Sequence, residues 1–142
     1  MKFNEILAYL IFAQINFRNL HWNTTGLDFF PCHEKMSEYY KSIDDYIDEI
    51  AEICVMKGEK TVTAMNFLEI LGDSDIKAKP ITSDVKSSKE VYTEAQHIWK
   101  NISEILYKVS KSGLSTGVVS KLDDLAYDAE KEATYKLALA LK

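Results

Sequence analysis

Two histidines and two acids are the side chains in this sequence whose types and spacing could do chemistry. His21 stands in the run Leu-His-Trp-Asn, and His33 stands in the run Pro-Cys-His-Glu. Asp48 and Glu52 follow four residues apart on the next predicted helix. Imidazole nitrogen mixed with carboxylate oxygen suits divalent iron and its neighbours in the periodic table. The first hypothesis is therefore a metal-dependent oxidation site.

The elements that must position these residues are predicted to be helices. Apolar residues recur at helical spacing through four long stretches, namely 3–22, 31–57, 83–111 and 115–141. A short helix is expected over 61–71, inside a long crossover that lets the second and third long helices run parallel. The segment 24–28 is a turn by composition. The sequence predicts an all-α bundle of four helices, with residues 1–142 as a single domain.

Composition narrows the class of protein further. With 142 residues, of which 46% are hydrophobic, the chain is long enough for one domain with a real core. The net charge of −5 does not favour binding to nucleic acid through the overall field. Two cysteines without a CxxC pair, and no hydrophobic signal segment, favour a reduced cytoplasmic setting. No stretch has the pattern of a membrane-spanning helix.

Spacing along the second helix limits how the four candidate ligands can act together. At about 1.5 Å per residue, His33 and Asp48 lie ~22 Å apart along one helix axis. They cannot bind the same ion from one copy of the chain. Either the histidines and the acids serve different purposes, or two copies of this helix meet antiparallel across a two-fold axis. The second arrangement would make dimerisation a condition for metal binding.

At these residues the chain resembles the Dps proteins (DNA protection during starvation), a dodecameric branch of the ferritin-like superfamily. The run 20–29, Leu-His-Trp-Asn-Thr-Thr-Gly-Leu-Asp-Phe, is similar to the signature at the end of their first helix. Further matches at the family's spacings are His33-Glu34, Asp48, Ala51-Glu52, 67–77 and 130–137. The resemblance therefore covers nearly the whole chain.

This resemblance implies a hollow shell of twelve ferritin-like four-helix bundles, each with a long crossover that carries a short helix. Such a shell oxidises ferrous iron, preferentially with hydrogen peroxide, and keeps the ferric mineral inside. Carried over by position, His21 and His33 would bind one or two irons from one subunit. Asp48 would anchor the first metal and Glu52 would bridge the metals, both from the partner subunit. Trp22 would lie close enough to donate an electron during peroxide reduction.

The chain departs from the family pattern at three places. Four residues after the second histidine the family usually carries an acid, and this chain has Ser37, so the second metal position is expected to be weak or absent. At the start of the last helix, where the family places pore-lining acids, the segment 113–118 has no carboxylate. The lysine-rich tail by which some members bind DNA is missing, so we expect weak DNA binding or none.

Simpler interpretations stay open beside the iron site. A histidine at a helix end is often a cap, and acids on a helix are often only solvated. Glu94 and His97 match the Glu-x-x-His pattern of in-bundle di-iron sites, but they fall on the polar side of their helix. Three functions remain: an iron-oxidising shell, a protective assembly that kept the fold and lost efficient iron chemistry, and a monomeric oxidase acting on a small organic substrate.

Overall fold

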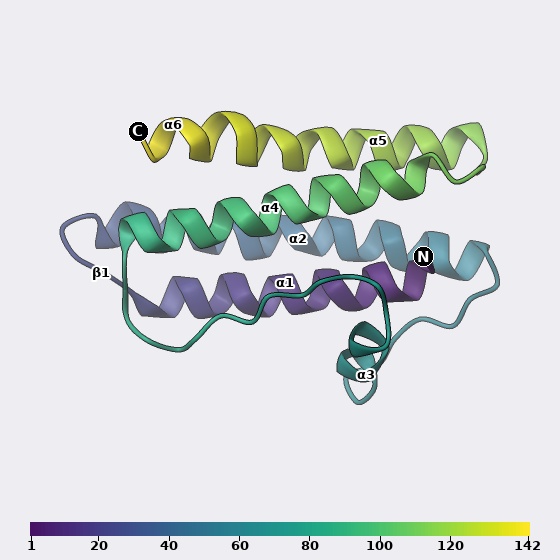
Figure 1. Ribbon diagram of the computed structural model, residues 1–142, viewed down its shortest axis with the longest axis horizontal. Helices are drawn as coiled ribbons and strands as arrows, with labels where there is room; N and C mark the ends of the chain where they lie inside the picture. The colour runs from purple at the N-terminus through teal and green to yellow at the C-terminus, as the bar shows by residue number, and fades with distance from the viewer. The chain divides into compact units, whose positions relative to one another are not determined.

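The computed structural model describes residues 1–142 and is mostly helical (Figure 1). None of its helices combines the length and the apolar character that crossing a membrane requires. The chain divides into two compact units, one made of 1–23 and 33–85, the other of 24–32 and 86–142.

The first unit is built on a pair of antiparallel helices, α1 (Phe3–Asn23) and α2 (Phe29–Met56). Gln14 Nε2 donates to the Tyr40 carbonyl at 2.8 Å, and the Phe17 ring packs on the Tyr39 ring with centroids 5.3 Å apart. The five apolar positions that predict the first helix are all buried: Phe3, Leu7, Leu10, Phe17 and Leu20. Both helix predictions are therefore confirmed to within two residues at each end.

The short crossover helix, α3, is smaller than its prediction. It covers Phe67–Gly72 and packs on α1, whereas the sequence pattern predicted a helix from residue 61. The missing part is explained by Asn66, whose side-chain oxygen accepts the Thr63 backbone N–H at 2.7 Å. The segment is also rich in β-branched residues, which disfavour a helix: Thr61, Val62 and Thr63. The side-chain hydrogen bond of Asn66 is therefore formed here in place of helical backbone hydrogen bonds.

The second unit contains α4 (Ser88–Ser110), α5 (Thr116–Lys131), a π-helical segment η1 (Glu132–Leu137) and α6 (Ala138–Ala140). α4 packs along α5 and η1 (Figure 1). Gln96 Nε2 donates to the Ala133 carbonyl at 3.0 Å, and Tyr107 Oη donates to Glu130 Oε1 at 2.9 Å. Ser115 caps α5 by accepting the Val118 N–H, as its sequence position predicts.

Two local features of this unit differ from the sequence prediction. β1 (Thr24–Thr25) pairs in parallel with β2 (Lys86–Ser87), where a turn and a helix start were expected. α4 consequently begins after Ser87 rather than at residue 83, and Ser87 and Glu90 form a reciprocal capping box. The π-helical turn of η1 is the other feature that the 3.6-residue pattern does not predict.

Candidate metal site

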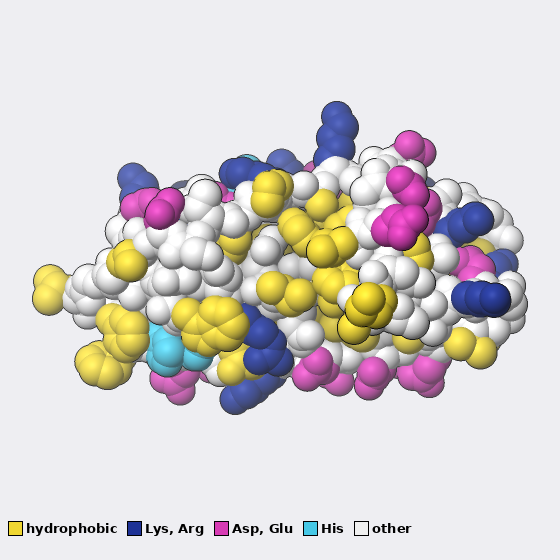
Figure 2. All heavy atoms as spheres, turned by 90° about the horizontal axis from the view of Figure 1, so that it is seen from below, with side chains coloured by type: hydrophobic (Ala, Val, Ile, Leu, Met, Phe, Trp, Pro, Cys, Tyr) yellow, Lys and Arg dark blue, Asp and Glu magenta, His cyan; other side chains and the backbone are white.

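The two histidines predicted as ligands lie against each other in the first unit. Their rings are stacked, with centroids 3.7 Å apart and planes 15° from parallel. His21 ends α1 and His33 lies in the first turns of α2, so the antiparallel pairing of these helices brings them together. Both side chains are half-buried, and histidine side chains are visible at the molecular surface in Figure 2.

Each histidine is held by the backbone of the other. His21 Nδ1 lies 2.6 Å from the His33 carbonyl oxygen, and His33 Nδ1 lies 2.7 Å from the His21 carbonyl oxygen. A carbonyl oxygen can only accept, so both Nδ1 atoms must carry the proton. Both lone pairs are then on Nε2, which is the tautomer and the orientation that second-shell carbonyls impose on metal-binding histidines. Nε2 is therefore the nitrogen of each ring that could bind a metal ion.

The Tyr40 side chain contacts His21 of this pair, and Arg18 and Ser37 in turn contact Tyr40. Of these three residues, the sequence motifs single out only Ser37. The Tyr40 ring meets the His21 ring edge-on, with centroids 5.4 Å apart. The guanidinium of Arg18, the only arginine of the chain, lies 4.2 Å from the centre of the Tyr40 ring. Ser37 donates a 3.4 Å hydrogen bond to the Tyr40 hydroxyl.

A spacing signal for these neighbours was present in the sequence. Arg18 precedes His21 by three residues, and Tyr40 follows His33 by seven, so each shares a helix face with its histidine. Tyr40 also falls at helical spacing between the apolar residues Met36 and Ile43, both of which are buried. This spacing favours a packing role for Tyr40. In the structure, however, Tyr40 is only half-buried, and the buried tyrosine is its neighbour Tyr39.

The acids predicted as ligands are not brought to the histidines within one chain. Asp48 and Glu52 are exposed on α2, and Asp48 lies about 22 Å along the helix axis from His33. No group of three or more His, Cys, Asp or Glu side chains in the chain could hold a metal ion. Asp44, another exposed acid of α2, accepts a 2.6 Å hydrogen bond from Gln14.

Trp22 and His97 take different positions from the histidine pair. Trp22 directly follows His21 and is 64% exposed, which is unusual for a residue of its size. His97 is exposed on α4 beside the buried Ile98, so it lies on the polar side of that helix as expected.

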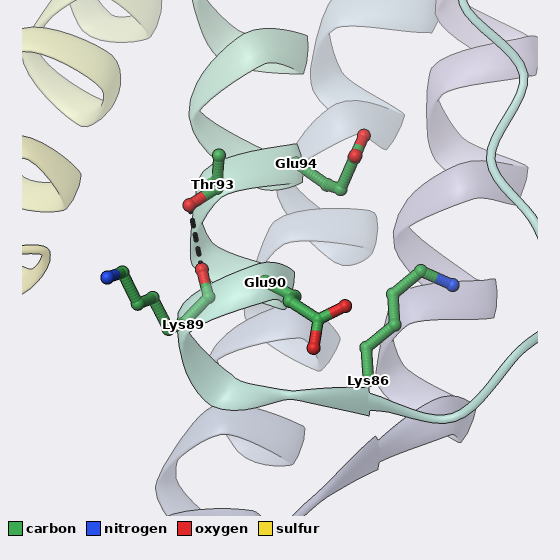
Figure 3. Close-up of a pocket in the computed structure, with 5 residues that line it drawn as sticks. All are labelled: Lys86, Lys89, Glu90, Thr93 and Glu94. Carbon is green, nitrogen blue, oxygen red and sulfur yellow. Dashed lines mark hydrogen bonds between the residues drawn. The ribbon is translucent and has the colours of Figure 1, made fainter.

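The lysines near the start of α4 do not form a phosphate-binding track. Figure 3 shows Lys86 and Lys89 on either side of Glu90, with Glu94 one turn further on. The Thr93 hydroxyl donates back to the Lys89 carbonyl at 2.8 Å rather than pointing to a ligand. The charges of this pocket are mixed, which does not suit the capture of a polyanion.

The two cysteines are free and buried. Burial raises the pKa of the Cys32 thiol, and contacts with Thr24 and Tyr92 partly oppose this rise. Burial and then the nearby charge of Glu59 raise the pKa of Cys54. Thiols of this kind carry little thiolate at neutral pH and are poor nucleophiles and poor metal ligands.

Comparison with known proteins agrees with this fold. Residues 2–139 match the family described as ferritin-like domain. Because that match spans nearly the whole chain, the protein belongs to the ferritin-like family.

Named relatives define the branch of this family. The chain is 28% identical over 137 residues to the DNA protection during starvation protein of Helicobacter pylori, a match covering 89% of this chain and 90% of that protein. It is 26% identical over 124 residues to antigen TpF1 of Treponema pallidum, covering 85% and 70% of the two chains. The first of these relatives, together with the ferritin-like match, supports membership of the Dps branch.

Solved structures support the same fold. The crystal structure of Helicobacter cinaedi CAIP superposes with a TM-score of 0.84 at 24% identity, covering 99% of this chain and 96% of that one. A Dps protein from Bacillus brevis gives 0.84 at 23% identity, covering 99% and 92%. The architecture is therefore the ferritin-like four-helix bundle with a short helix in the crossover between the second and third long helices.

Proposed function

We propose that this protein is an iron-oxidising and iron-storing Dps-type shell. The ferritin-like family and its Dps branch support iron storage and protection in general. The observation that carries the more specific proposal is the reciprocal hydrogen bonding of His21 and His33, which engages Nδ1 of each ring with a backbone carbonyl and leaves Nε2 as the nitrogen that would bind iron. Two nitrogen donors alone do not provide the hard oxygen ligands that iron prefers.

A second copy of the chain supplies those oxygen ligands in this proposal. Because Asp48 and Glu52 are exposed and too far along α2 to reach His33 of the same copy, they are available to a neighbour. A two-fold axis that packs α2 against its copy brings the histidines of each subunit to the acids of the other subunit. The dimer then contains two equivalent sites. Asp48 and Glu52 would hold the iron from the partner subunit, as the resemblance to the Dps proteins implies.

The chemistry follows from this set of ligands. Carboxylates favour the higher charge of ferric iron and so lower its reduction potential, while two adjacent ferrous ions can together deliver two electrons. One hydrogen peroxide then takes one electron from each iron and, with two protons, leaves as two water molecules. This two-electron reduction releases no hydroxyl radical. Its absence is what makes the reaction protective.

Trp22 is proposed as an auxiliary electron donor. It is adjacent to His21 in the chain and exposed, so an indole is available beside the site when only one ferrous ion is bound. In that case peroxide receives its second electron from the indole.

The proposal is tested with iron-free protein given ferrous iron and stoichiometric peroxide, followed by size-exclusion chromatography with in-line mass and ferric absorbance. We expect ferric absorbance to co-elute with a particle of about twelve subunits, the assembly that the resemblance implies. Asp48→Ala should abolish ferrous binding without unfolding the helices, because the side chain is exposed. The matched control is Asp45→Ala, which removes another exposed acid of α2.

Two outcomes would contradict the site. Unchanged ferrous affinity in Asp48→Ala would remove this carboxylate from the ligand set. An equal loss in Asp45→Ala would show that general negative charge on α2, rather than a ligand, attracts iron.

A second candidate function is a protective assembly with weakened or lost iron oxidation. Ser37 stands where an acidic ligand is expected, and the segment 113–118 at the start of α5 has no carboxylate to draw cations toward a pore. A shell that elutes at the expected mass without ferric absorbance would favour this candidate. In both candidates we propose a cytoplasmic protein that binds DNA weakly or not at all.

A further inference from the structure

The phenol of Tyr40 reaches the turn of α2 where an acidic ligand is missing. Side chains on a helix lean toward its N-terminal end, and the Tyr40 ring is long enough to span one turn. Its hydroxyl oxygen lies 3.4 Å from Ser37 Oγ, so the oxygen stands at the level of residue 37 rather than residue 40. Residue 37 is four after His33 and therefore on the same face of α2.

The Tyr40 ring also contacts one of the two histidines, His21. It meets the His21 ring at 77° with centroids 5.4 Å apart, and both residues are half-buried. The phenol therefore belongs to the same cluster of side chains as His21, on the same subunit, and its oxygen is a hard donor. Tyrosinate is an established protein ligand of iron, for example in haem proteins.

We propose that Tyr40 supplies a phenolate oxygen to ferric iron at the His21–His33 site, in place of the acid that Ser37 does not provide. The inference rests on the proposed function, since iron must first bind and be oxidised there. As the iron–oxygen bond forms, the phenol O–H bond breaks and its proton passes to water. No electron moves in this step.

Two neighbours of Tyr40 suit this role. Ser37 points its hydroxyl proton at the phenol oxygen, and such a donor stabilises negative charge on that oxygen. The Arg18 guanidinium, 4.2 Å from the ring centre, adds a positive charge that offsets the phenolate.

The test is spectroscopic and does not depend on turnover. Protein is loaded with no more than two ferrous ions per subunit, oxidised with peroxide, and examined by visible absorption and resonance Raman spectroscopy. A phenolate bound to ferric iron gives a visible charge-transfer band that enhances tyrosinate ring modes. We expect this band in the native protein and its loss in Tyr40→Phe, with bound iron measured by a colorimetric chelator in each sample.

The matched control is Tyr39→Phe. Tyr39 is the neighbouring tyrosine of α2, 5% exposed and packed on Phe17 rather than on a histidine, so its variant should keep the band. Circular dichroism and particle mass establish that each variant folds and assembles. A second variant, Ser37→Asp, should weaken the band because its carboxylate competes with the phenolate for the iron.

The outcomes separate this inference from the function on which it rests. Bound ferric iron without the band, or a band that persists in Tyr40→Phe, would overturn the role of Tyr40 and leave iron oxidation intact. Native protein that binds no iron in the chelator assay would overturn both.

Discussion

Main-chain carbonyls hydrogen-bond both imidazole rings of the candidate site. Each Nδ1 donates to a carbonyl oxygen, at 2.6 Å for His21 and 2.7 Å for His33. Replacing either histidine therefore leaves the carbonyl that orients the other one in place. At the residue scale, the hydrogen bond that orients each ring therefore depends on the pairing of α1 with α2. It does not depend on the side chain of the other histidine.

Ser37 gives the sharpest test at the residue scale. Ser37→Asp places a carboxylate on the histidine face of α2, so ferrous affinity should rise by about tenfold or more, equivalent to ~1.4 kcal/mol. Ferrous binding by titration calorimetry under anaerobic conditions measures this change. Ser42→Asp, on an exposed position of the same helix, is the control for added charge and should change affinity little. Equal affinities in both variants and in the native protein would mean that the native site never lacked a ligand.

The residues of the site were predictable to different degrees. His21 and His33 were found from their types and spacing, and the structure brings them together. The lock between their rings and carbonyls was not predictable, because it depends on the relative rotation of two helices. The pairing of these histidines with Asp48 and Glu52 of a second copy stays a prediction.

At the element scale, capping residues decide where the helices begin. The long helices were predictable from apolar periodicity, whereas the start of α4 was not. Ser83 and Ser87 both have a residue type that can cap a helix. Ser87 is used because Glu90, three residues later, completes a capping box. The parallel pairing of β1 with β2 was not predictable either. Each strand has only two residues, which is too few to show the alternating pattern of a strand.

The capping box of α4 should be measurable as stability. Ser87 Oγ accepts the Glu90 N–H at 3.3 Å, so Ser87→Ala leaves a helix N–H without its side-chain acceptor. We expect the free energy of unfolding to fall by ~1 kcal/mol. Urea unfolding at one fixed protein concentration measures it, because assembly makes stability depend on concentration. Ser42→Ala, where the hydroxyl only donates back to the Tyr39 carbonyl, should change little, and a loss equal to that of Ser87→Ala would refute the capping role.

At the scale of the whole molecule, the chain has the architecture of its family. One copy of the chain, however, does not bring together a complete set of metal ligands. The ferritin-like fold was predictable from the helix pattern and from the resemblance at His21, Trp22 and His33, and comparison with solved structures confirms it. The single domain over 1–142 stays a prediction. The number of subunits was not predictable from physical reasoning, because the distance argument requires only a two-fold pair.

Subunit complementation tests the central claim, which is that each iron site is built from two copies of the chain. One parent carries His21→Ala and His33→Ala, and the other carries Asp48→Ala and Glu52→Ala. Neither parent alone should oxidise iron, since neither has a complete ligand set. In shells reassembled from an equal mixture, half of the two-fold pairs are mixed and each holds one intact site, so about a quarter of native ferroxidase activity should return. Mixed shells of native mass that stay as inactive as both parents would contradict a site shared between subunits.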